Sequence, residues 1–285
     1  MNEEMDKTLM KELERHARHI GAKLEKARKM ASERVPVAGT MHKVLPPGER
    51  DTAKIDYKEC LEREIMLDNL GAALGPRPDR ICPPGTYTRL LTKRVPEDPT
   101  NSEWCVMMTD APYEIRSSME FIENARGNVL VAGLGLGATL LPVLRKHSVK
   151  TVLVLEKNPD VIALVSKHIL RQRGGKKLAI EQADAHTWRP GKRFARARWD
   201  TIWLDIWPDV SVGNLIDMRA LRRRFARWVA PKGWIGVWEW NWLHQQDAEI
   251  ARSLDEVYAA VGGRDLSKWP PKGDKIKIDG QEVKL

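Results

Sequence analysis

The chain has 285 residues, a formal net charge of +9 and a pI near 9.5. This length accommodates one large domain, or a core domain with an appendage, and a substantial hydrophobic core. The sequence has no run of about 20 apolar residues, and residues 1–34 are charged throughout. These features exclude a membrane-spanning helix and a secretory signal peptide, so we expect a cytoplasmic protein.

The cysteines predict neither a disulfide framework nor a metal site. Cys60, Cys82 and Cys105 are far apart and odd in number, and no C-x-x-C motif or matching histidine spacing accompanies them. The positive charge suggests an anionic partner, either nucleic acid or an acidic small molecule. A solvated basic face is the alternative. The excess of basic over acidic residues is concentrated in residues 167–198 and in Arg219, Arg222, Arg223, Arg224 and Arg227.

Residues 1–50 are predicted to form an amphipathic helix and a linker. Apolar residues recur every three or four positions and end before Pro36, where a segment rich in proline and glycine begins. The apolar stripe has to pack against the core or against a second copy of the chain, so a homo-oligomer is one expectation. The stripe consists of Met5, Leu9, Leu13, Ala17, Ile20, Leu24 and Ala27.

Residues 51–126 are predicted to form a smaller cap region. We expect a helix over residues 52–74, capped by Asp51, followed by strands over residues 86–91 and 104–109. Asp110 is then placed to cap a helix that leads into the core domain.

The core domain is predicted to span residues 127–285 and to begin with a βαβ unit. A strand over residues 129–132 is followed by a glycine loop, a helix over residues 138–147 and a second strand over residues 152–155. Both strands are continuous apolar runs, as expected for strands buried on both faces of a parallel sheet.

This βαβ unit is predicted to bind a nucleotide. Gly133, Gly135 and Gly137 let the backbone approach a ligand where a Cβ would clash, and the first turn of the following helix offers free N–H groups. Glu156 stands at the end of the second strand, where a carboxylate can accept hydrogen bonds from a ribose diol. The loop also satisfies the dinucleotide pattern, which leaves NAD open as a ligand.

Strands and helices alternate through the rest of the core, which predicts a doubly wound, mostly parallel α/β sheet. The fourth strand ends at Asp205, and a later strand is expected to end near Trp238. Residues 275–284 contain Asp279-Gly280 between two short alternating runs and predict a β-hairpin. One or both of its strands could add an antiparallel edge to the sheet.

The runs GNVLVAGLGLG and VLVLEKNPDVIALV resemble motif I and the acidic strand end of class I S-adenosylmethionine (SAM)-dependent methyltransferases. Within that superfamily the chain is most similar to the spermidine-synthase-like branch, and the resemblance covers residues 108–240. It implies a Rossmann-like fold and SAM as cofactor. The cofactor-binding residues that it implies are Gly133, Leu134, Gly135, Gly137, Glu156, Lys157, Asp184 and Ala185.

Asp205 is the residue that we expect at the reacting centre. It follows a buried strand, at the place where amino methyltransferases carry an acid-Pro-Pro-aromatic motif that orients an amine, and here the motif is only partly retained. Trp207, Glu239 and Trp240 are candidate substrate-binding residues, because aromatic faces can stack a base or hold a sulfonium. If the last strand continues, Trp238, Trp240 and Trp242 share one of its faces.

Methyl transfer is a better prediction than polyamine synthesis. Spermidine synthases carry an acid inside the glycine loop and a D-x-x-D pair, whereas this chain has Leu136 and Pro208 at the corresponding positions. Aminopropyl transfer, with decarboxylated SAM, is the second hypothesis. Two further alternatives are an NAD-dependent oxidoreductase and a non-catalytic module that binds nucleic acid or a protein partner. The acceptor, a small molecule or a nucleic acid, is not identified by the sequence.

Overall fold

The computed structural model describes most of the core of the chain. The described residues are 35–60, 82–93, 104–191, 198–260, 275–278 and 281–284, with isolated residues between 11 and 29, and from residue 251 onward the backbone alone. The chain divides into two compact units. The first comprises Met1–Val210 and Ile216–Glu239, and the second comprises Ser211–Leu215 and Trp240–Leu285.

A five-stranded sheet, parallel throughout, forms the core of the first unit. Its order is β7 (Leu178–Gln182), β6 (Val149–Glu156), β5 (Gly127–Ala132), β8 (Trp199–Leu204) and β9 (Val229–Val237). The first strand in the chain, β5, lies at the centre. The next two, β6 and β7, follow on one side, and β8 and β9 follow on the other. With the strands numbered from β5, this is the 3-2-1-4-5 order of a doubly wound sheet. The predicted Rossmann-like α/β fold is confirmed, with the switch point between β5 and β8.

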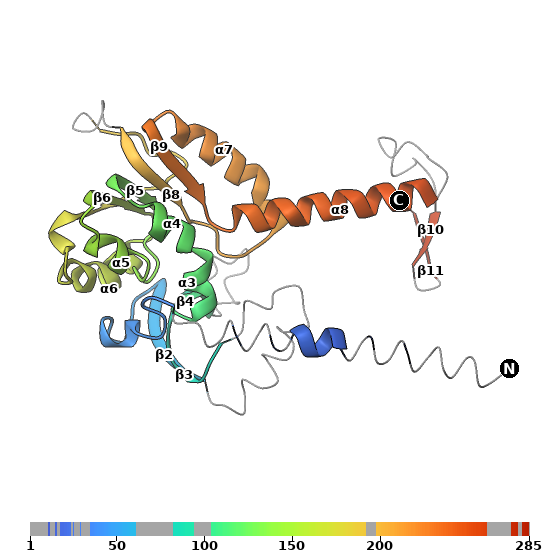
Figure 1. Ribbon diagram of the computed structural model, residues 1–285, viewed down its shortest axis with the longest axis horizontal. Coiled ribbons are helices and arrows are strands. Elements are labelled where there is room, and N and C mark those ends of the chain that lie inside the picture. The colour runs from blue at the N-terminus through green and yellow to red at the C-terminus, as the bar shows by residue number, and fades with distance from the viewer. Residues whose placement is uncertain are drawn as a thin grey trace. The chain divides into compact units, whose positions relative to one another are not determined.

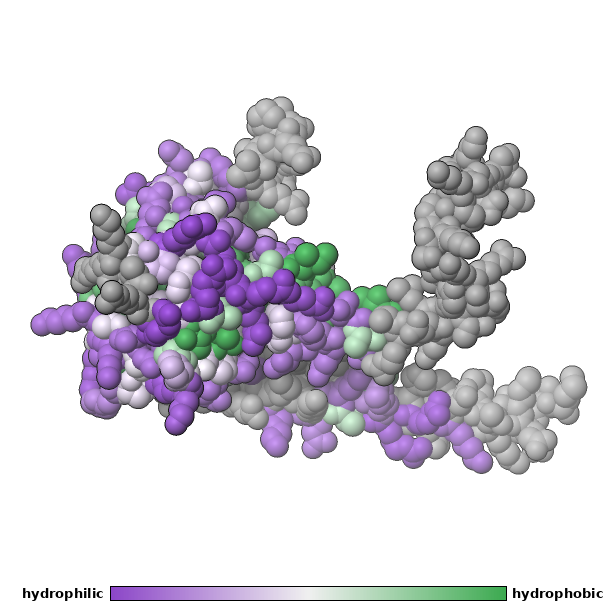
Figure 2. All heavy atoms as spheres, turned by 90° about the horizontal axis from the view of Figure 1, so that it is seen from above, coloured by the Kyte–Doolittle hydropathy of each residue, from purple (hydrophilic) through white to green (hydrophobic). Residues whose placement is uncertain are grey.

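Helices cover both faces of this sheet. α5 (Leu140–Arg145) and α6 (Pro159–Leu170) lie on one side and α7 (Leu215–Ala226) on the other (Figure 1). Asn158 caps α6 by accepting hydrogen bonds from two backbone N–H groups of its first turn. Figure 2 looks onto the side where α7 lies in Figure 1, and the described residues there are largely hydrophilic, with smaller hydrophobic areas between them.

The hydrophobic core fills the space between sheet and helices. Val129, Val131 and Val154 are almost fully buried, as predicted for strands covered on both faces. Trp203 on β8 stacks with Phe121 and with Trp234, with ring centroids 5.3 and 6.1 Å apart. Phe121 belongs to α4 (Met119–Asn124), so these aromatic contacts fix the helix that precedes β5 against the sheet.

The N-terminal part of the first unit contains a second, antiparallel sheet, which corrects one prediction. Its strands are β1 (Gly48–Glu49), β2 (Ala53–Cys60), β3 (Gly85–Lys93) and β4 (Trp104–Thr109). The strands predicted at residues 86–91 and 104–109 are therefore confirmed. The helix predicted over residues 52–74 is wrong for residues 53–60, which form β2. Residues 61–74 lie outside the described part of the chain.

Pairing across strands explains why residues 53–60 are extended. Ala53 and Ile55 point into the core and are at most 1% exposed, so burial alternates along β2. On the partly exposed face, Arg89 of β3 donates two hydrogen bonds of 2.7 Å to the carboxylate of Asp56, its direct partner in the ladder. Short-range helical periodicity is overridden by these long-range contacts.

Asp110 has a different role from the predicted helix cap. The helix that follows is α3 (Pro112–Ser117), whose N-cap is Ala111 and has no side-chain capping bond. The carboxylate of Asp110 is fully buried and accepts backbone hydrogen bonds from Met41 (2.8 Å) and Thr88 (2.6 Å). Burial raises the pKa of Asp110, and these two hydrogen bonds act against that rise. Asp110 thus joins the 3-10 turn η1 (Met41–Lys43) to β3.

The end of β9 corrects a second prediction. The strand stops at Val237, Trp238 and Glu239 form a turn, and α8 (Trp240–Ala260) begins at Trp240. Glu239 has a φ of 54°, in the left-handed region that breaks an extended strand. Trp238, Trp240 and Trp242 therefore do not share one face of a strand.

The second unit contains α8 and the predicted hairpin. β10 (Lys275–Ile278) pairs antiparallel with β11 (Gln281–Lys284), and Ile278 is the partner of Gln281, which leaves a two-residue connection. The hairpin forms a sheet of its own, so the expectation that it extends the parallel sheet is wrong for the described strands.

Residues 18–23 near the N-terminus are helical, as predicted for part of the long amphipathic helix. The remaining residues of that stripe lie largely outside the described part of the chain. Within the described residues, no helix combines the length and the apolar character that are needed to cross a bilayer.

Removing the carboxylate of Asp110 is expected to destabilise the fold. Asp110→Ala leaves two buried N–H groups without an acceptor, which should lower the free energy of unfolding by about 2–4 kcal/mol in urea titrations. Glu120→Ala, on the exposed surface of α4, is the matched control and should change it by less than about 0.5 kcal/mol. A loss below about 1 kcal/mol for Asp110→Ala would contradict this role.

Candidate functional site

A cavity of about 1050 Å³ lies at the carboxyl ends of the parallel strands. The first unit supplies all of its lining residues, from both the parallel sheet and the N-terminal antiparallel sheet. The predicted site residues that line it are Gly133, Leu134, Gly135, Gly137, Glu156, Lys157, Asp184, Ala185, Asp205 and Trp207. The fold therefore brings together in one cavity residues from four strand ends.

The glycine loop adopts backbone conformations that side chains disfavour. Gly133, Gly135 and Gly137 have φ angles of +100°, +49° and +70°. A Cβ on Gly133 would lie 1.9 Å from the carbonyl oxygen of Asp205, and one on Gly137 would lie 2.8 Å from Ile169. The loop consequently packs closely against the end of β8 and against α6, and its backbone faces the cavity.

Glu156 holds the glycine loop in place. One carboxylate oxygen accepts a hydrogen bond from the backbone N–H of Leu134 (2.9 Å), and the other accepts one from Asn158 (2.8 Å). Each oxygen can accept a further hydrogen bond, so the same carboxylate can bind the hydroxyl groups of a ligand.

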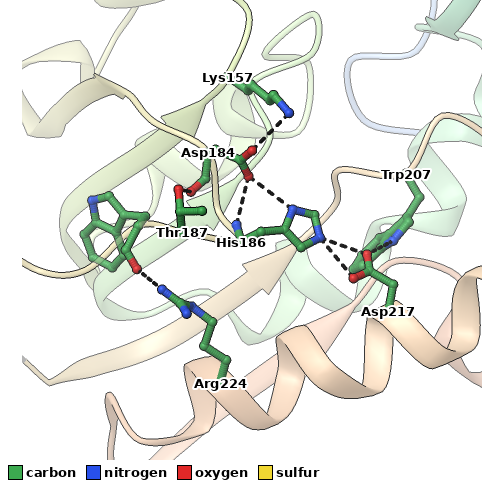
Figure 3. Close-up of polar contacts among 8 residues, drawn as sticks. Lys157, Asp184, His186, Thr187, Trp207, Asp217 and Arg224 are labelled. Atoms are coloured by element: carbon green, nitrogen blue, oxygen red, sulfur yellow. Dashed lines mark hydrogen bonds and ion pairs between the residues drawn. The ribbon is translucent and has the colours of Figure 1, made fainter.

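A chain of polar contacts runs along the rim of the cavity (Figure 3). Lys157 forms an ion pair of 2.9 Å with Asp184, and the other oxygen of Asp184 accepts the backbone N–H of His186 (2.9 Å) and contacts its ring nitrogen Nδ1 (3.1 Å). The second ring nitrogen of His186 lies 3.0 Å from Asp217 on α7. The indole N–H of Trp207 donates to the same carboxylate (2.8 Å).

These contacts shift the titration of the acid and of the histidine. The hydrogen bond from Lys157, followed by the backbone N–H of His186, lowers the pKa of Asp184 to about 2. The hydrogen bond to Asp217, with a smaller contribution from Asp184, raises the pKa of His186 despite partial burial. Asp184 is thus an anion, and His186 is favoured as a cation between two carboxylates.

Asp205 is held in a very different environment. Burial raises its pKa to about 7, and the charge of Glu239 adds to that rise. The indole N–H of Trp203 acts against it, although this buried N–H makes no ordinary hydrogen bond with a described residue. Asp205 is half-buried and lines the cavity, so a ligand there meets a carboxyl group whose pKa is raised toward neutrality.

The predicted substrate-binding residues do not all line the cavity. Trp207 is 9% exposed and lines the cavity with its indole fixed by Asp217. Glu239 forms the turn after β9 and acts on Asp205 through its charge. Trp240 begins α8 in the second unit, where its ring lies 4.2 Å from that of His244. Trp238 lines the cavity and donates its indole N–H to Ser117 (2.8 Å).

Several cavity residues were not identified from the sequence. Met108 of β4 lies on the glycine loop, and its sulfur accepts a hydrogen bond from the backbone N–H of Leu136 (3.1 Å). Glu114 and Thr92 also line the cavity, and Thr92 lies in the region that has no family resemblance. His186 directly follows the predicted Asp184-Ala185, but Asp217 lies 31 residues further on and no local pattern joins them. No cluster of three potential metal ligands occurs among the described residues.

No protein-family model matches the chain, and no curated protein matches it either. Solved structures do. A spermidine synthase from Thermotoga maritima is 17% identical over 67% of this chain and 55% of its own, with a TM-score of 0.39. The CcbJ methyltransferase from Streptomyces caelestis is 16% identical over 43% of this chain and 50% of its own, with a TM-score of 0.33.

The N-methyltransferase NodS from Bradyrhizobium japonicum is 17% identical over 43% of this chain and 61% of its own, with a TM-score of 0.30. The chain thus spans only about half to three-fifths of these solved chains. The resemblance found in the sequence, to methyltransferases and to a spermidine synthase, recurs among the solved structures. It is a likeness of fold alone.

His186 should titrate above its ordinary pKa of about 6.5 because Asp217 and Asp184 favour the charged ring. In an NMR titration of the ring protons, Asp217→Asn should move the midpoint down, and solvent screening limits the change because the ring is 45% exposed. Glu120→Gln removes the same charge elsewhere and should leave the midpoint unchanged. An equal midpoint in wild type and Asp217→Asn would refute the coupling.

Asp205 should make the stability of the fold depend on pH. Its folded-state pKa of about 7 lies above the ordinary value, so the folded state holds the proton more tightly, and stability falls as pH rises from 5 to about 7. Asp205→Asn should lack this pH dependence. The difference in the free energy of unfolding between wild type and Asp205→Asn, measured in urea, should therefore change by at most about 1.4 kcal/mol per pH unit. A difference that is flat between pH 5 and pH 8 would contradict the raised pKa.

Proposed function

We propose that the chain is a SAM-dependent methyltransferase with Asp205 at the reacting centre. The observation that carries this proposal is the cavity that joins the glycine loop, the carboxylate of Glu156 at the end of β6 and the carboxyl group of Asp205, whose pKa burial raises. The cavity lies outside the carboxyl ends of the strands, where open α/β sheets bind their ligands. Its volume of about 1050 Å³ can hold a nucleoside cofactor and a small acceptor together.

The residues present fit the cofactor. The glycine loop keeps its backbone bare toward the cavity, since Cβ atoms at Gly133 and Gly135 would collide with Asp205 and with Met108. Glu156 is positioned to accept ribose hydroxyl hydrogen bonds, and Asp184 follows β7, where it can accept from the adenine amino group. Bound SAM supplies a methyl group on a cationic sulfur, which is electrophilic.

Asp205 orients the acceptor. Its carboxylate form accepts a hydrogen bond from an N–H or O–H group of the acceptor and takes up the proton that this group releases on methylation. The wall around it contains Trp203, Trp207 and Trp238, which exclude water and restrict the pose of the acceptor. Transfer then depends mainly on alignment, which can supply several kcal/mol of the barrier.

Cofactor binding tests the proposal. SAM and S-adenosylhomocysteine should bind the wild type in calorimetry, and Glu156→Ala should weaken both by at least about tenfold, because two ribose hydrogen bonds are lost. Glu156→Gln keeps one oxygen for the Leu134 or Asn158 N–H and serves as the variant that preserves the loop. Glu59→Ala, an exposed acid on β2, is the matched control.

The choice of ligand separates the competing functions. Stronger binding of decarboxylated SAM than of SAM would replace methyl transfer by aminopropyl transfer, and binding of NAD alone would replace both by a redox function. Release of S-adenosylhomocysteine in the presence of a panel of amine and hydroxyl acceptors, lost in Asp205→Asn, is the activity expected. Cofactor binding without release on any acceptor would favour a non-catalytic module.

A further inference from the structure

The charges of the first unit are separated along the direction of the parallel strands. The cavity at the carboxyl ends is lined by more acidic than basic side chains: Asp51, Glu114, Glu156, Asp160, Asp184 and Asp205, against Lys93, Lys157 and His186. The opposite edge, where the strands begin, carries mainly exposed basic residues, with the acids Glu123 and Asp200 beside them. The basic residues are Arg126, Arg145, Lys150, Arg171, Arg173, Lys176, Arg198, Arg227 and Lys232, and we call this set the basic edge.

The topology places these residues together. All strands of the sheet are parallel, so the residues before or at their first positions share one edge, and so do the last residues of the helices that lead into them. Lys150 is the second residue of β6, and Arg198 directly precedes β8. The guanidinium of Arg126, just before β5, donates to the carbonyl oxygen of Lys232 (2.7 Å), which joins the starts of β5 and β9.

Local structure accounts for only some of the basic residues on this side. Two lysines close helix ends and are partly buried: Lys146 donates to the carbonyl oxygens of Ile122 and Glu123, and Lys177 donates to that of Lys146. By contrast, Lys150, Arg173 and Lys232 are exposed and form no ion pair with any described residue. Their charge remains available to a partner.

We propose that the basic edge binds the phosphate backbone of duplex nucleic acid, independently of its sequence. Neighbouring strands lie about 4.8 Å apart, so the edge from β7 to β9 is about 19 Å wide. This width spans several phosphates of a duplex, which carries one negative charge per about 1.7 Å of its axis. The charges are spread along this edge instead of lining a narrow groove, as suits a surface that contacts successive phosphates.

The surroundings favour duplex nucleic acid over other polyanions. Leu170 is the one large hydrophobic side chain among the described residues of this edge that is strongly exposed, whereas a membrane-surface site inserts several apolar side chains. The ring of Trp228 is half-buried and Arg227 lies 5.6 Å from its centre, so it presents no open face for stacking a single-stranded base.

Binding at this edge leaves the cavity open at the other end of the sheet. The nucleic acid is therefore a partner that localises the protein, and it is not the acceptor of the methyl group. Nucleic acid and S-adenosylhomocysteine should bind at the same time, without competition. The inference does not depend on methyl transfer, because it rests on a different face of the fold.

The test uses the full chain, a fluorescently labelled 20-base-pair DNA duplex of mixed sequence, and anisotropy between 50 and 150 mM salt. If about five phosphates are contacted, affinity should fall about a hundredfold over this range. The triple variant Lys150→Gln, Arg173→Gln, Lys232→Gln should weaken binding at least tenfold at 50 mM salt and reduce the salt slope by about 2–3. Saturating S-adenosylhomocysteine should leave the affinity unchanged.

A control triple variant removes the same charge from the N-terminal region: Lys43→Gln, Arg50→Gln, Lys58→Gln, all of them exposed. It should weaken duplex binding by less than about threefold, and both triple variants should unfold at the wild-type temperature. Equal weakening by the two sets would mean that net charge alone attracts DNA, and would overturn the proposal. So would the absence of duplex binding, or stronger binding to phosphatidylserine vesicles than to the duplex.

Discussion

The close approach between Gly133 and the carbonyl oxygen of Asp205 fixes the geometry on which the site depends. A Cβ on Gly133 would lie 1.9 Å from that oxygen, so only glycine allows the ends of β5 and β8 to come so near. The backbone N–H of Gly133 also donates to Leu155 (2.8 Å), and that of Asp205 donates to Ala132 (2.9 Å). These hydrogen bonds join the ends of β5, β6 and β8 just beyond the sheet, so Glu156 and Asp205 line the same cavity.

The residues that line the cavity come from two different sheets, one parallel and one antiparallel. The parallel sheet supplies the glycine loop and Glu156 through a local βαβ pattern, whereas Met108 reaches the loop from an antiparallel strand. The two sheets are joined at Thr52, whose backbone N–H and hydroxyl both donate to Asp160 at the start of α6 (2.9 and 2.7 Å). The position of the N-terminal sheet is thereby coupled to the helix that follows Glu156.

The sequence predicts those features that depend on local patterns. The strands around Val131 and Val154 are apolar throughout, and the glycines and Glu156 follow at fixed spacings, so the fold and the glycine loop could be predicted. Residues 53–60 could not, because their extended form depends on partners such as Arg89, 33 residues away. The contact between His186 and Asp217 is likewise long-range, and the break at Glu239 is set by one backbone angle that no motif encodes.

The separation of charge also bears on the acceptor. The chain carries a net charge of +9, and nine exposed basic residues lie where the parallel strands begin, whereas Asp205 in the cavity experiences the negative charge of Glu239. An anionic acceptor would be repelled there, and it would further disfavour ionisation of Asp205. A cationic acceptor would have the opposite effect, because a positive charge beside Asp205 lowers its pKa and favours the carboxylate. A neutral acceptor would bring no such repulsion. If Asp205 takes up the acceptor's proton as we propose, its environment favours acceptors that carry no negative charge.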